Sequence, residues 1–241
     1  MKGQKVLSQS KTGNRILAAL TPADFALLQP SLEAVDLPVR RQLELRNRAI
    51  ENIYFLDSGL ASMVVSAGAN HNIEVGIVGR EGMTGLPVLL ESDRAWHETF
   101  IQTAGKGWRL TAEQLRAAIK QSPSLRRIMM RYVNSQVSQM AYTALANGRY
   151  KIEERLERWL LMADDRAQGD IIHLTHESLA LMLGARRAGV TNALSEFQRR
   201  GVLRVRRGAI AVLDREGLEE SANGSYGTPE AEYKRLFGQD I

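Results

Sequence analysis

A helix predicted from about Arg187 to Arg200 has two faces of different chemistry. Its apolar residues recur at spacings of four and three, as on the buried side of a helix: Val190, Leu194 and Phe197. The opposite face holds small residues and hydrogen-bond donors: Arg187, Ala188, Thr191, Asn192 and Ser195. A solvated face would more usually be rich in Glu and Lys that pair four residues apart. In the DNA major groove, Arg suits guanine, Asn suits adenine, and Thr can contact the thymine methyl group.

The segment before this helix predicts the first half of a helix-turn-helix. Thr175 can cap a helix that runs to Leu183, and Gly184 permits the tight turn that follows. Two short helices joined by a glycine-containing turn of three or four residues are typical of this motif. The helix from Arg187 would then be the second, exposed helix of the pair.

Positive charge gathers around this motif. Between Gly184 and Gly208 there are seven arginines against one acid, Glu196, whereas the formal net charge of the whole chain is +5. The segment VLRVRRGAIAVL predicts a hairpin that turns at Arg207-Gly208, which would complete a winged helix-turn-helix. Arginines in such a hairpin can contact phosphates, so the sequence favours double-stranded DNA as the partner.

Composition restricts the other classes of protein. The 241 residues are 44% hydrophobic and 24% charged, enough for one large or two smaller globular domains. Because there is no cysteine, disulfides, zinc-thiolate sites and cysteine-held iron–sulfur clusters are excluded. The polar start and the lack of a run of about 18 apolar residues predict a soluble, cytoplasmic protein without a membrane partner.

The first half of the chain is predicted to be a small β-domain behind a short helix. Residues 17–28 read as that helix, with Thr21 as its cap and Pro22 in its first turn. Turn residues separate several strand-like runs, which predict a small barrel or sandwich: residues 52–56, 60–66, 72–78, 99–104 and 108–110. Thr111 and Gln114 then have the form of a capping box, which starts a helix.

A long helix is predicted to begin at Ser122-Pro123 and to be interrupted at Asn147-Gly148, which we interpret as a hinge. A further helix over residues 150–167 would end at Gly169-Asp170. Apolar residues fall near one face of the long helix: Met129, Val133, Val137, Met140 and Ala144. This stripe fits either the chain's own core or a homodimer seam. We favour the seam, with Gln136 as a polar position in it, because a small β-domain offers little surface to bury a long helix.

In this order of elements, the chain resembles the Crp/Fnr superfamily of bacterial transcription regulators over roughly residues 17–215. The strongest local match is THESLALMLGARRAGVTNALSEFQRRGVL, and AIENIYFLDSGLASMVV resembles a strand pair of the family's β-roll. The resemblance implies an α+β chain in four parts. These are a β-roll effector domain (a cyclic-nucleotide-binding-like jelly roll) at 17–122, a dimerisation helix and hinge at 123–148, a winged helix-turn-helix at 149–221, and a tail at 222–241. The tail lies beyond the family core, and we expect a linker and then a short helix from Pro229 to Phe237.

The resemblance also implies roles for single residues. Arg187, Ala188 and Asn192 fall at the three positions that read bases in the family's cyclic-AMP receptor, and we add Thr191 from its place on the same face. Ala188 and Asn192 replace an acid and an arginine of that receptor, so the operator should differ from its half-site. The expected phosphate contacts are Thr175, His176, Arg186, Ser195, Arg204, Arg206 and Arg207. His176 is at a family phosphate position, although a histidine in a first turn is more often simply solvated.

The effector domain departs further from the family pattern. Members that bind cyclic nucleotides hold the ribose with a Gly-Glu-Leu turn, but here the turn reads Gly85-Leu86-Pro87. Leu86 cannot accept a hydrogen bond from a ribose hydroxyl, and Pro87 removes a backbone donor. Arg94 lies near the family's phosphate position but is followed by Ala95. We therefore expect a degenerate pocket at Gly85, Leu86 and Arg94, an effector other than cyclic AMP, and no resident cofactor.

These observations predict a homodimer, paired through helix 123–147, that binds a palindromic operator, with RNA polymerase as a further candidate partner. An alternative is a small-molecule or cyclic-nucleotide sensor whose winged domain mediates protein contacts. A metal-binding cupin enzyme would need a His-x-His cluster, but the chain offers only His71 with Glu74 and, separately, His97-Glu98. Haem held by His71 or His97 has no motif to support it. We expect neither a metal site nor an enzyme.

Overall fold

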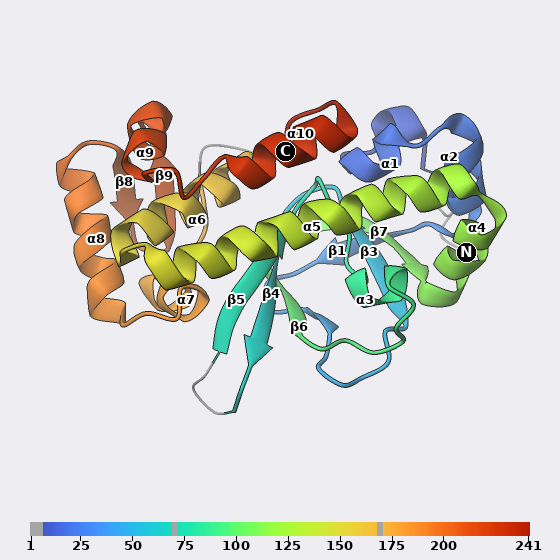
Figure 1. The fold of residues 1–241 in the computed structure, drawn as a ribbon, viewed down its shortest axis with the longest axis horizontal. Coiled ribbons are helices and arrows are strands. Elements are labelled where there is room, and N and C mark those ends of the chain that lie inside the picture. Colours follow the sequence, from blue (N-terminus) through green and yellow to red (C-terminus); the bar gives the residue numbers. More distant parts are fainter. Residues whose placement is uncertain (1–6, 69–71, 168–170) are drawn as a thin grey trace. The chain divides into compact units, whose positions relative to one another are not determined.

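The structure, a computed structural model, describes residues 7–68, 72–167 and 171–241 of the chain (Figure 1). The chain forms two compact units. The first comprises Met1–Met63 and Ile77–Gln136, and the second comprises Val64–Gly76 and Val137–Ile241. The fourfold division expected from the sequence stays a prediction, because the two units follow contacts in space rather than those boundaries.

Within the described part of the chain, seven strands build the β-roll. They are β1 (Glu33–Leu37), β2 (Gln42–Glu44), β3 (Asn52–Leu56), β4 (Leu60–Ser66), β5 (Asn72–Val78), β6 (Glu98–Thr103) and β7 (Gly105–Thr111). One sheet has the order β1-β7-β3 and the other the order β2-β6-β4-β5. The predicted strands are confirmed, and those at 52–56, 60–66 and 72–78 match to the residue. β1 and β2 were missed because their sequences, EAVDL and QLE, are short and interrupted by charged residues, and so show no strand pattern.

Short helices accompany the β-roll: η1 (Gln9–Lys11), α1 (Arg15–Ala19), α2 (Pro22–Leu28), η2 (Gln29–Ser31), α3 (Leu86–Leu89) and α4 (Ala112–Gln121). The single helix expected over residues 17–28 is wrong, since the chain leaves the helical conformation between α1 and α2. Thr21 is extended because it precedes Pro22, and its side chain caps α2 by accepting from the Asp24 amide. The capping box of Thr111 and Gln114 at the start of α4 is confirmed.

The long helix α5 runs from Pro123 to Arg149. Its start is confirmed, because the Ser122 hydroxyl accepts from the Leu125 amide at 3.1 Å. The interruption expected at Asn147-Gly148 is wrong, since α5 continues to Arg149. One glycine costs a helix only about 1 kcal/mol, too little to end one that is otherwise well formed. The break comes at Tyr150-Lys151, where the Glu154 carboxylate accepts from the Lys151 amide at 2.8 Å and opens the next helix.

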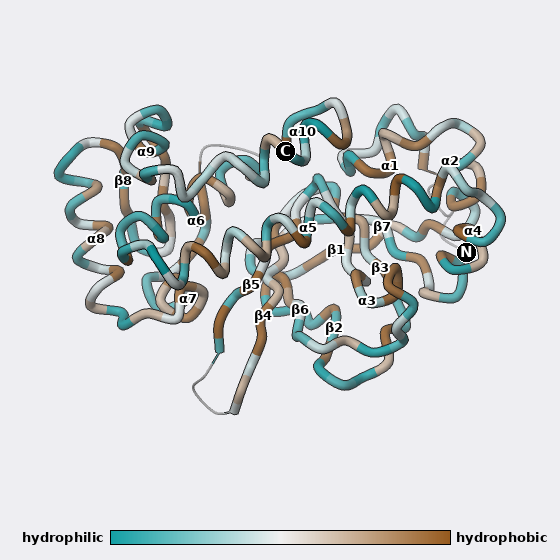
Figure 2. Tube along the Cα trace, in the orientation of Figure 1, coloured by the Kyte–Doolittle hydropathy of each residue, from teal (hydrophilic) through white to brown (hydrophobic). Residues whose placement is uncertain are grey.

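The apolar stripe of α5 divides along the helix, whose apolar and polar residues alternate in Figure 2. Met129 and Val133 are buried, whereas Val137 is 52% exposed and Ala144 is also exposed. Gln136 is buried and therefore does not share the exposed part of the stripe.

The second unit contains a winged helix-turn-helix. Its helices are α6 (Ile152–Arg166), α7 (His176–Met182), α8 (Arg187–Arg199), α9 (Arg215–Ser221) and α10 (Thr228–Phe237). Strands β8 (Leu203–Arg206) and β9 (Ala209–Val212) form the predicted hairpin, and Ile172 pairs with Ile210 of β9. The expected helix end at Gly169-Asp170 lies outside the described residues. None of the helices that the structure describes is long and apolar enough to cross a membrane.

The C-terminal segment is fixed to α6 rather than loosely linked to it. The Arg215 guanidinium pairs with Asp164 and Asp165, both at 2.7 Å, and donates to the Tyr226 hydroxyl at 2.7 Å. Tyr226 in turn donates to Asp165 at 2.7 Å. Burial raises the pKa of Tyr226, and the Asp165 carboxylate raises it further, so the hydroxyl keeps its proton. The expected helix is confirmed as α10, but the expected linker before it is wrong, because Ser225 is 2% exposed.

Replacing Tyr226→Phe should therefore destabilise the second unit. The change removes a part-buried hydroxyl that bridges Arg215 and Asp165, a loss of about 1–3 kcal/mol. Urea unfolding followed by circular dichroism measures the effect. Tyr142→Phe, at a half-buried tyrosine of α5, is the matched control. Equal unfolding midpoints for the two variants would contradict the bridge.

Candidate nucleic-acid interface

Helix α7 and the turn after it are built by local chemistry. The Thr175 hydroxyl accepts from the Ser178 amide at 3.1 Å, which confirms the predicted cap. Leu179 and Met182 are buried on the inner side of α7. Gly184 has a φ of 56°, in the left-handed region, and a Cβ there would lie 3.2 Å from the Ile73 side chain. Glycine adopts this φ with the least strain and leaves room for Ile73, so it favours the turn that precedes α8.

Helix α8 has the two faces that its sequence predicts. Its apolar residues are almost completely buried: Val190, Ala193, Leu194 and Phe197. On the opposite face four of the five expected residues are exposed: Arg187, Ala188, Asn192 and Ser195. Thr191 is half-buried, and its hydroxyl lies 3.1 Å from Nδ1 of His176. The polar face thus points away from the core of the unit, with Thr191 tied to the first helix of the motif.

The hydroxyl groups of Ser195, on α8, and Thr175, at the start of α7, are already engaged within the chain. The Ser195 hydroxyl donates to the Thr191 carbonyl at 2.9 Å, so its proton is in use. The Thr175 hydroxyl accepts from the backbone and lies 3.0 Å from the Ser178 hydroxyl. By contrast, the side chains of Arg187 and Asn192 make no hydrogen bond to any described residue. These two can meet a ligand without breaking an existing bond.

The seven arginines of this region fall into two groups. Arg199 forms a two-bond ion pair with Glu196, at 2.9 and 2.7 Å, and these hydrogen bonds lower the pKa of Glu196. Arg200 pairs with the buried Glu157 at 3.3 Å. The other five are exposed and have no ion-pair partner within the described ranges: Arg186, Arg187, Arg204, Arg206 and Arg207. The sequence count of seven therefore overstates the free positive charge by two.

A buried carboxylate anchors the end of α8. Glu157 of α6 is 2% exposed and accepts from Ser221 of α9 at 2.6 Å and from Arg200 at 3.3 Å. Burial raises the pKa of Glu157, while the Ser221 and Arg200 contacts lower it. Sequence reasoning missed this residue because its partners lie 43 and 64 positions further along the chain.

The wing presents arginine from one face of its hairpin. In the register of β8 and β9, Arg204 lies opposite Ala211 and Arg206 lies opposite Ala209. Since side chains alternate along a strand, Arg204 and Arg206 point to the same side, away from buried Leu203. The turn at Arg207-Gly208 is confirmed, with Gly208 at a φ of 70°. Small opposing residues leave both arginine side chains free to reach outward.

The residues expected to form an effector pocket lie in unlike surroundings. The Gly85 amide donates to the buried Glu44 carboxylate at 2.9 Å, and Leu86 is 4% exposed. The Arg94 side chain is 63% exposed and donates to the Asn47 carbonyl at 3.0 Å. The backbone N–H of Gly85 is therefore already bonded within the chain, to Glu44.

The two histidines considered as haem ligands differ in what the structure describes. His97 is completely buried and lies 3.1 Å from Glu44, which also accepts from Thr99. His71 lies outside the described residues. Among the residues that the structure does describe, no three His, Asp or Glu side chains gather to hold a metal ion.

Comparisons with known proteins agree with this architecture. Residues 154–221 match the family model of the Crp-like helix-turn-helix domain. Among curated proteins, none matches this chain significantly. FixK2 from Bradyrhizobium japonicum is similar with a TM-score of 0.68 and 15% identity over 78% of this chain and 96% of that chain. A CRP-family transcriptional regulator from Thermus thermophilus has a TM-score of 0.66 and 18% identity over 80% of this chain and 98% of that chain.

A Crp/Fnr-family chain from Eubacterium rectale is similar too, with a TM-score of 0.67 and 18% identity over 87% of this chain and 98% of that chain. At such identities the solved structures show the fold alone, whereas the family model covers the sequence of the winged unit. The α+β fold, with its β-roll, long helix and winged helix-turn-helix, is thus the Crp/Fnr fold. Residues 154–221 therefore form a Crp-like helix-turn-helix domain by sequence, and the chain as a whole has the fold of the Crp/Fnr-family transcription regulators to which it is similar.

Proposed function

We propose that this chain regulates transcription by binding a palindromic DNA operator as a homodimer. The observation that carries the proposal is the outer face of α8. Arg187, Ala188 and Asn192 are exposed there, and the same winged unit also exposes four further arginines without ion-pair partners among its described residues, Arg186, Arg204, Arg206 and Arg207. Phosphate contacts provide affinity and base contacts provide sequence preference, and this unit offers side chains for both.

Within this proposal the residues of α8 have separate tasks. Arg187 and Asn192 read base edges directly, because neither side chain is engaged elsewhere. Ala188 lets the helix approach the groove closely, and Thr191 contributes its methyl group while its hydroxyl stays near His176. Arg186, Arg204, Arg206 and Arg207 contact phosphates, as can Thr175 and His176. Ser195 reaches a phosphate as a donor only if it releases the Thr191 carbonyl.

The homodimer seam follows the exposed small and apolar residues of α5. Val137 and Leu145 are 52% and 45% exposed, and Ala141 and Ala144 are exposed between them. Their spacings of four, three and one place all four on one side of the helix. Pairing of two such helices would bring the two recognition helices about one DNA turn apart, roughly 34 Å.

The effector in this proposal is a molecule other than cyclic AMP. The Gly85 amide is already bonded to Glu44, and the exposed Arg94 is bonded to Asn47. The Gly85 amide, which has a single proton, would have to give up its bond to hold a cyclic nucleotide, and the Arg94 side chain would have to turn from its present position. The proposal also places the protein in the cytoplasm, with RNA polymerase as a partner at the promoter.

Selection of bound sequences from a random DNA pool tests the proposal, followed by mobility shifts of the selected site over a salt series. A regulator should enrich a two-fold symmetric site and bind it less tightly as salt rises, because phosphate contacts release counterions. If the winged domain serves protein contacts instead, the pool will not converge on any sequence.

Replacing Arg187→Ala should weaken binding to the selected site by about 1–3 kcal/mol and relax the preference at one base position of each half-site. The reason is the loss of a two-bond contact to a base edge. Competition titrations against single-base variants of the site measure both effects. An unchanged preference would show that Arg187 does not read a base. Arg126→Ala, at an exposed arginine of α5, controls for the lost charge.

Replacing Arg206→Ala should weaken binding to all DNA sequences alike. A lost phosphate contact carries no sequence information, and it should lower the slope of log affinity against log salt by about 1. Titrations at four or more salt concentrations, on the selected site and on a scrambled duplex, provide the slopes. A loss confined to the selected site would instead make Arg206 a base-reading residue.

Replacing Leu145→Asp should convert the dimer to a monomer, since two carboxylates would be buried near each other in the seam. Sedimentation velocity measures the change. Gln121→Asp, at an exposed position of α4, introduces the same charge outside the seam and should leave the dimer intact. A dimeric Leu145→Asp protein would rule out this face of α5.

A further inference from the structure

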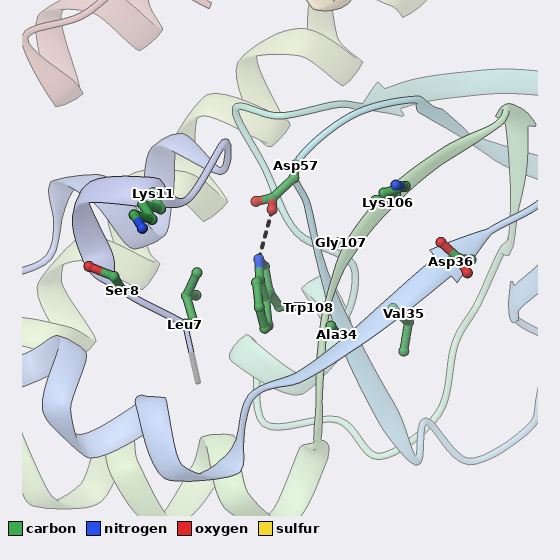
Figure 3. Close-up of a pocket in the computed structure, with 10 residues that line it drawn as sticks. All are labelled: Leu7, Ser8, Lys11, Ala34, Val35, Asp36, Asp57, Lys106, Gly107 and Trp108. Atoms are coloured by element: carbon green, nitrogen blue, oxygen red, sulfur yellow. Dashed lines mark hydrogen bonds between the residues drawn. The ribbon is translucent and has the colours of Figure 1, made fainter. Parts of the chain in front are cut away.

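A cavity of about 450 Å³ opens in the first unit beside the sheet β1-β7-β3 (Figure 3). The segment from Leu7 to Lys11 lies along one side of it, and strands β1 and β7 lie along the other. Small-molecule sites commonly have volumes of roughly 300–1,000 Å³ and mostly apolar walls with a few polar groups. The cavity shares no residue with the Gly85 turn or with the winged helix-turn-helix.

The apolar wall of the cavity is centred on Trp108. Ala34 lies directly opposite Trp108 in the β1-β7 register, so both side chains are on the same face of the sheet. Leu7 lies beside the indole ring in Figure 3, whereas Val35, the next residue along β1 after Ala34, points to the other face of the sheet and lines only the edge of the cavity. Since Ala34 carries only a methyl group, the space over this part of the sheet stays open. The wall therefore combines one large flat ring with the aliphatic side chains of Leu7 and Ala34.

The indole ring is held in place before any ligand arrives. Its Nε1 donates to Asp57 at 2.8 Å, the bond drawn in Figure 3. The other oxygen of Asp57 accepts from the Asn14 amide at 2.9 Å and from the Thr12 hydroxyl at 3.1 Å. A wall fixed in this way binds with little loss of side-chain entropy. The same contacts engage both oxygens of Asp57, so three donors of the chain share its negative charge and little hydrogen-bonding capacity is left for a ligand.

Two ammonium groups complete the lining. Lys11 and Lys106 are exposed, and neither has an ion-pair partner in the part of the chain that the structure describes. Figure 3 shows them on either side of Asp57. Asp36 lies opposite Lys106 in the strand register and offsets one of the two charges in part. The rim thus keeps cationic donors that are not neutralised by close contacts.

We propose that this cavity binds a small, flat aromatic anion, an aryl carboxylate or sulfonate. Its ring lies against the indole of Trp108, and its anionic group faces Lys11 and Lys106. Ring stacking matches the flat wall, and charge-assisted hydrogen bonds match the free ammonium groups. The site is independent of the proposed DNA binding, because none of its residues belongs to the second unit.

Fluorescence titration of the full chain with 8-anilino-1-naphthalenesulfonate tests the proposal without DNA. The dye is an aromatic anion that fluoresces when it leaves water. Binding should saturate at one dye per chain. The double variant Lys11→Gln with Lys106→Gln should raise the dissociation constant about tenfold or more, the scale of a lost charged hydrogen bond. The matched control is Lys120→Gln with Arg126→Gln, at two exposed cations of α4 and α5, and should bind like the unaltered chain.

Two further measurements distinguish the contribution of the aromatic ring to binding from that of the anionic group. Ala34→Phe fills the space against Trp108 with a side chain that suits a strand, and it should abolish saturable binding. The neutral dye N-phenyl-1-naphthylamine should respond to Ala34→Phe but not to the lysine variants. The proposal is overturned if the anionic dye fails to saturate, or if it binds the lysine double variant and the control alike. It is also overturned if Ala34→Phe, folded by circular dichroism, still binds at one dye per chain.

Discussion

The buried carboxylate of Glu157 is the interaction on which the candidate interface depends. It lies between α6, the end of α8 and α9, and its contacts to Arg200 and Ser221 are what make a charge tolerable there. Breaking such a pair from one side leaves an uncompensated charge, which is far more destabilising than the loss of an exposed pair. Helix α8 is therefore fixed at its C-terminal end by a charge and along its length by apolar packing. The direction in which its polar face points follows from these two constraints.

The C-terminal segment is likewise held in place by carboxylates of α6. The first half of α6 binds Asn223 through Glu154, at 3.0 Å, and its second half binds Arg215 and Tyr226 through Asp164 and Asp165. Carboxylates that would otherwise be solvated thus become bonded to residues beyond the wing. This explains how Ser225 can be buried in a polar segment, because its hydroxyl donates to the Glu154 carbonyl of another helix, at 3.3 Å, instead of to water.

The features that sequence reasoning could predict are those encoded within a few residues. Runs of apolar residues between turn residues predicted β3, β4 and β5, and the caps at Thr21, Thr111 and Thr175 marked helix starts. The two faces of α8 followed from its periodicity. What could not be predicted depends on partners far apart in the chain. The Glu157 anchor and the Trp108 cavity arise only when separate elements meet. The interruption predicted at Gly148 was wrong, because the small cost of one glycine in a helix is outweighed by the rest of the long helix α5.

The bond from Ser195 to the Thr191 carbonyl has a consequence for what α8 can recognise. Because the Ser195 hydroxyl donates its proton within the helix, only its lone pairs face outward, next to guanidinium and amide donors. A lone pair is repelled by anionic oxygen and attracted by the exocyclic amines of cytosine and adenine. If α8 enters the major groove as proposed, its outer face would present an acceptor one turn away from its donors. Such a face would distinguish base pairs by the order of their amine and carbonyl groups.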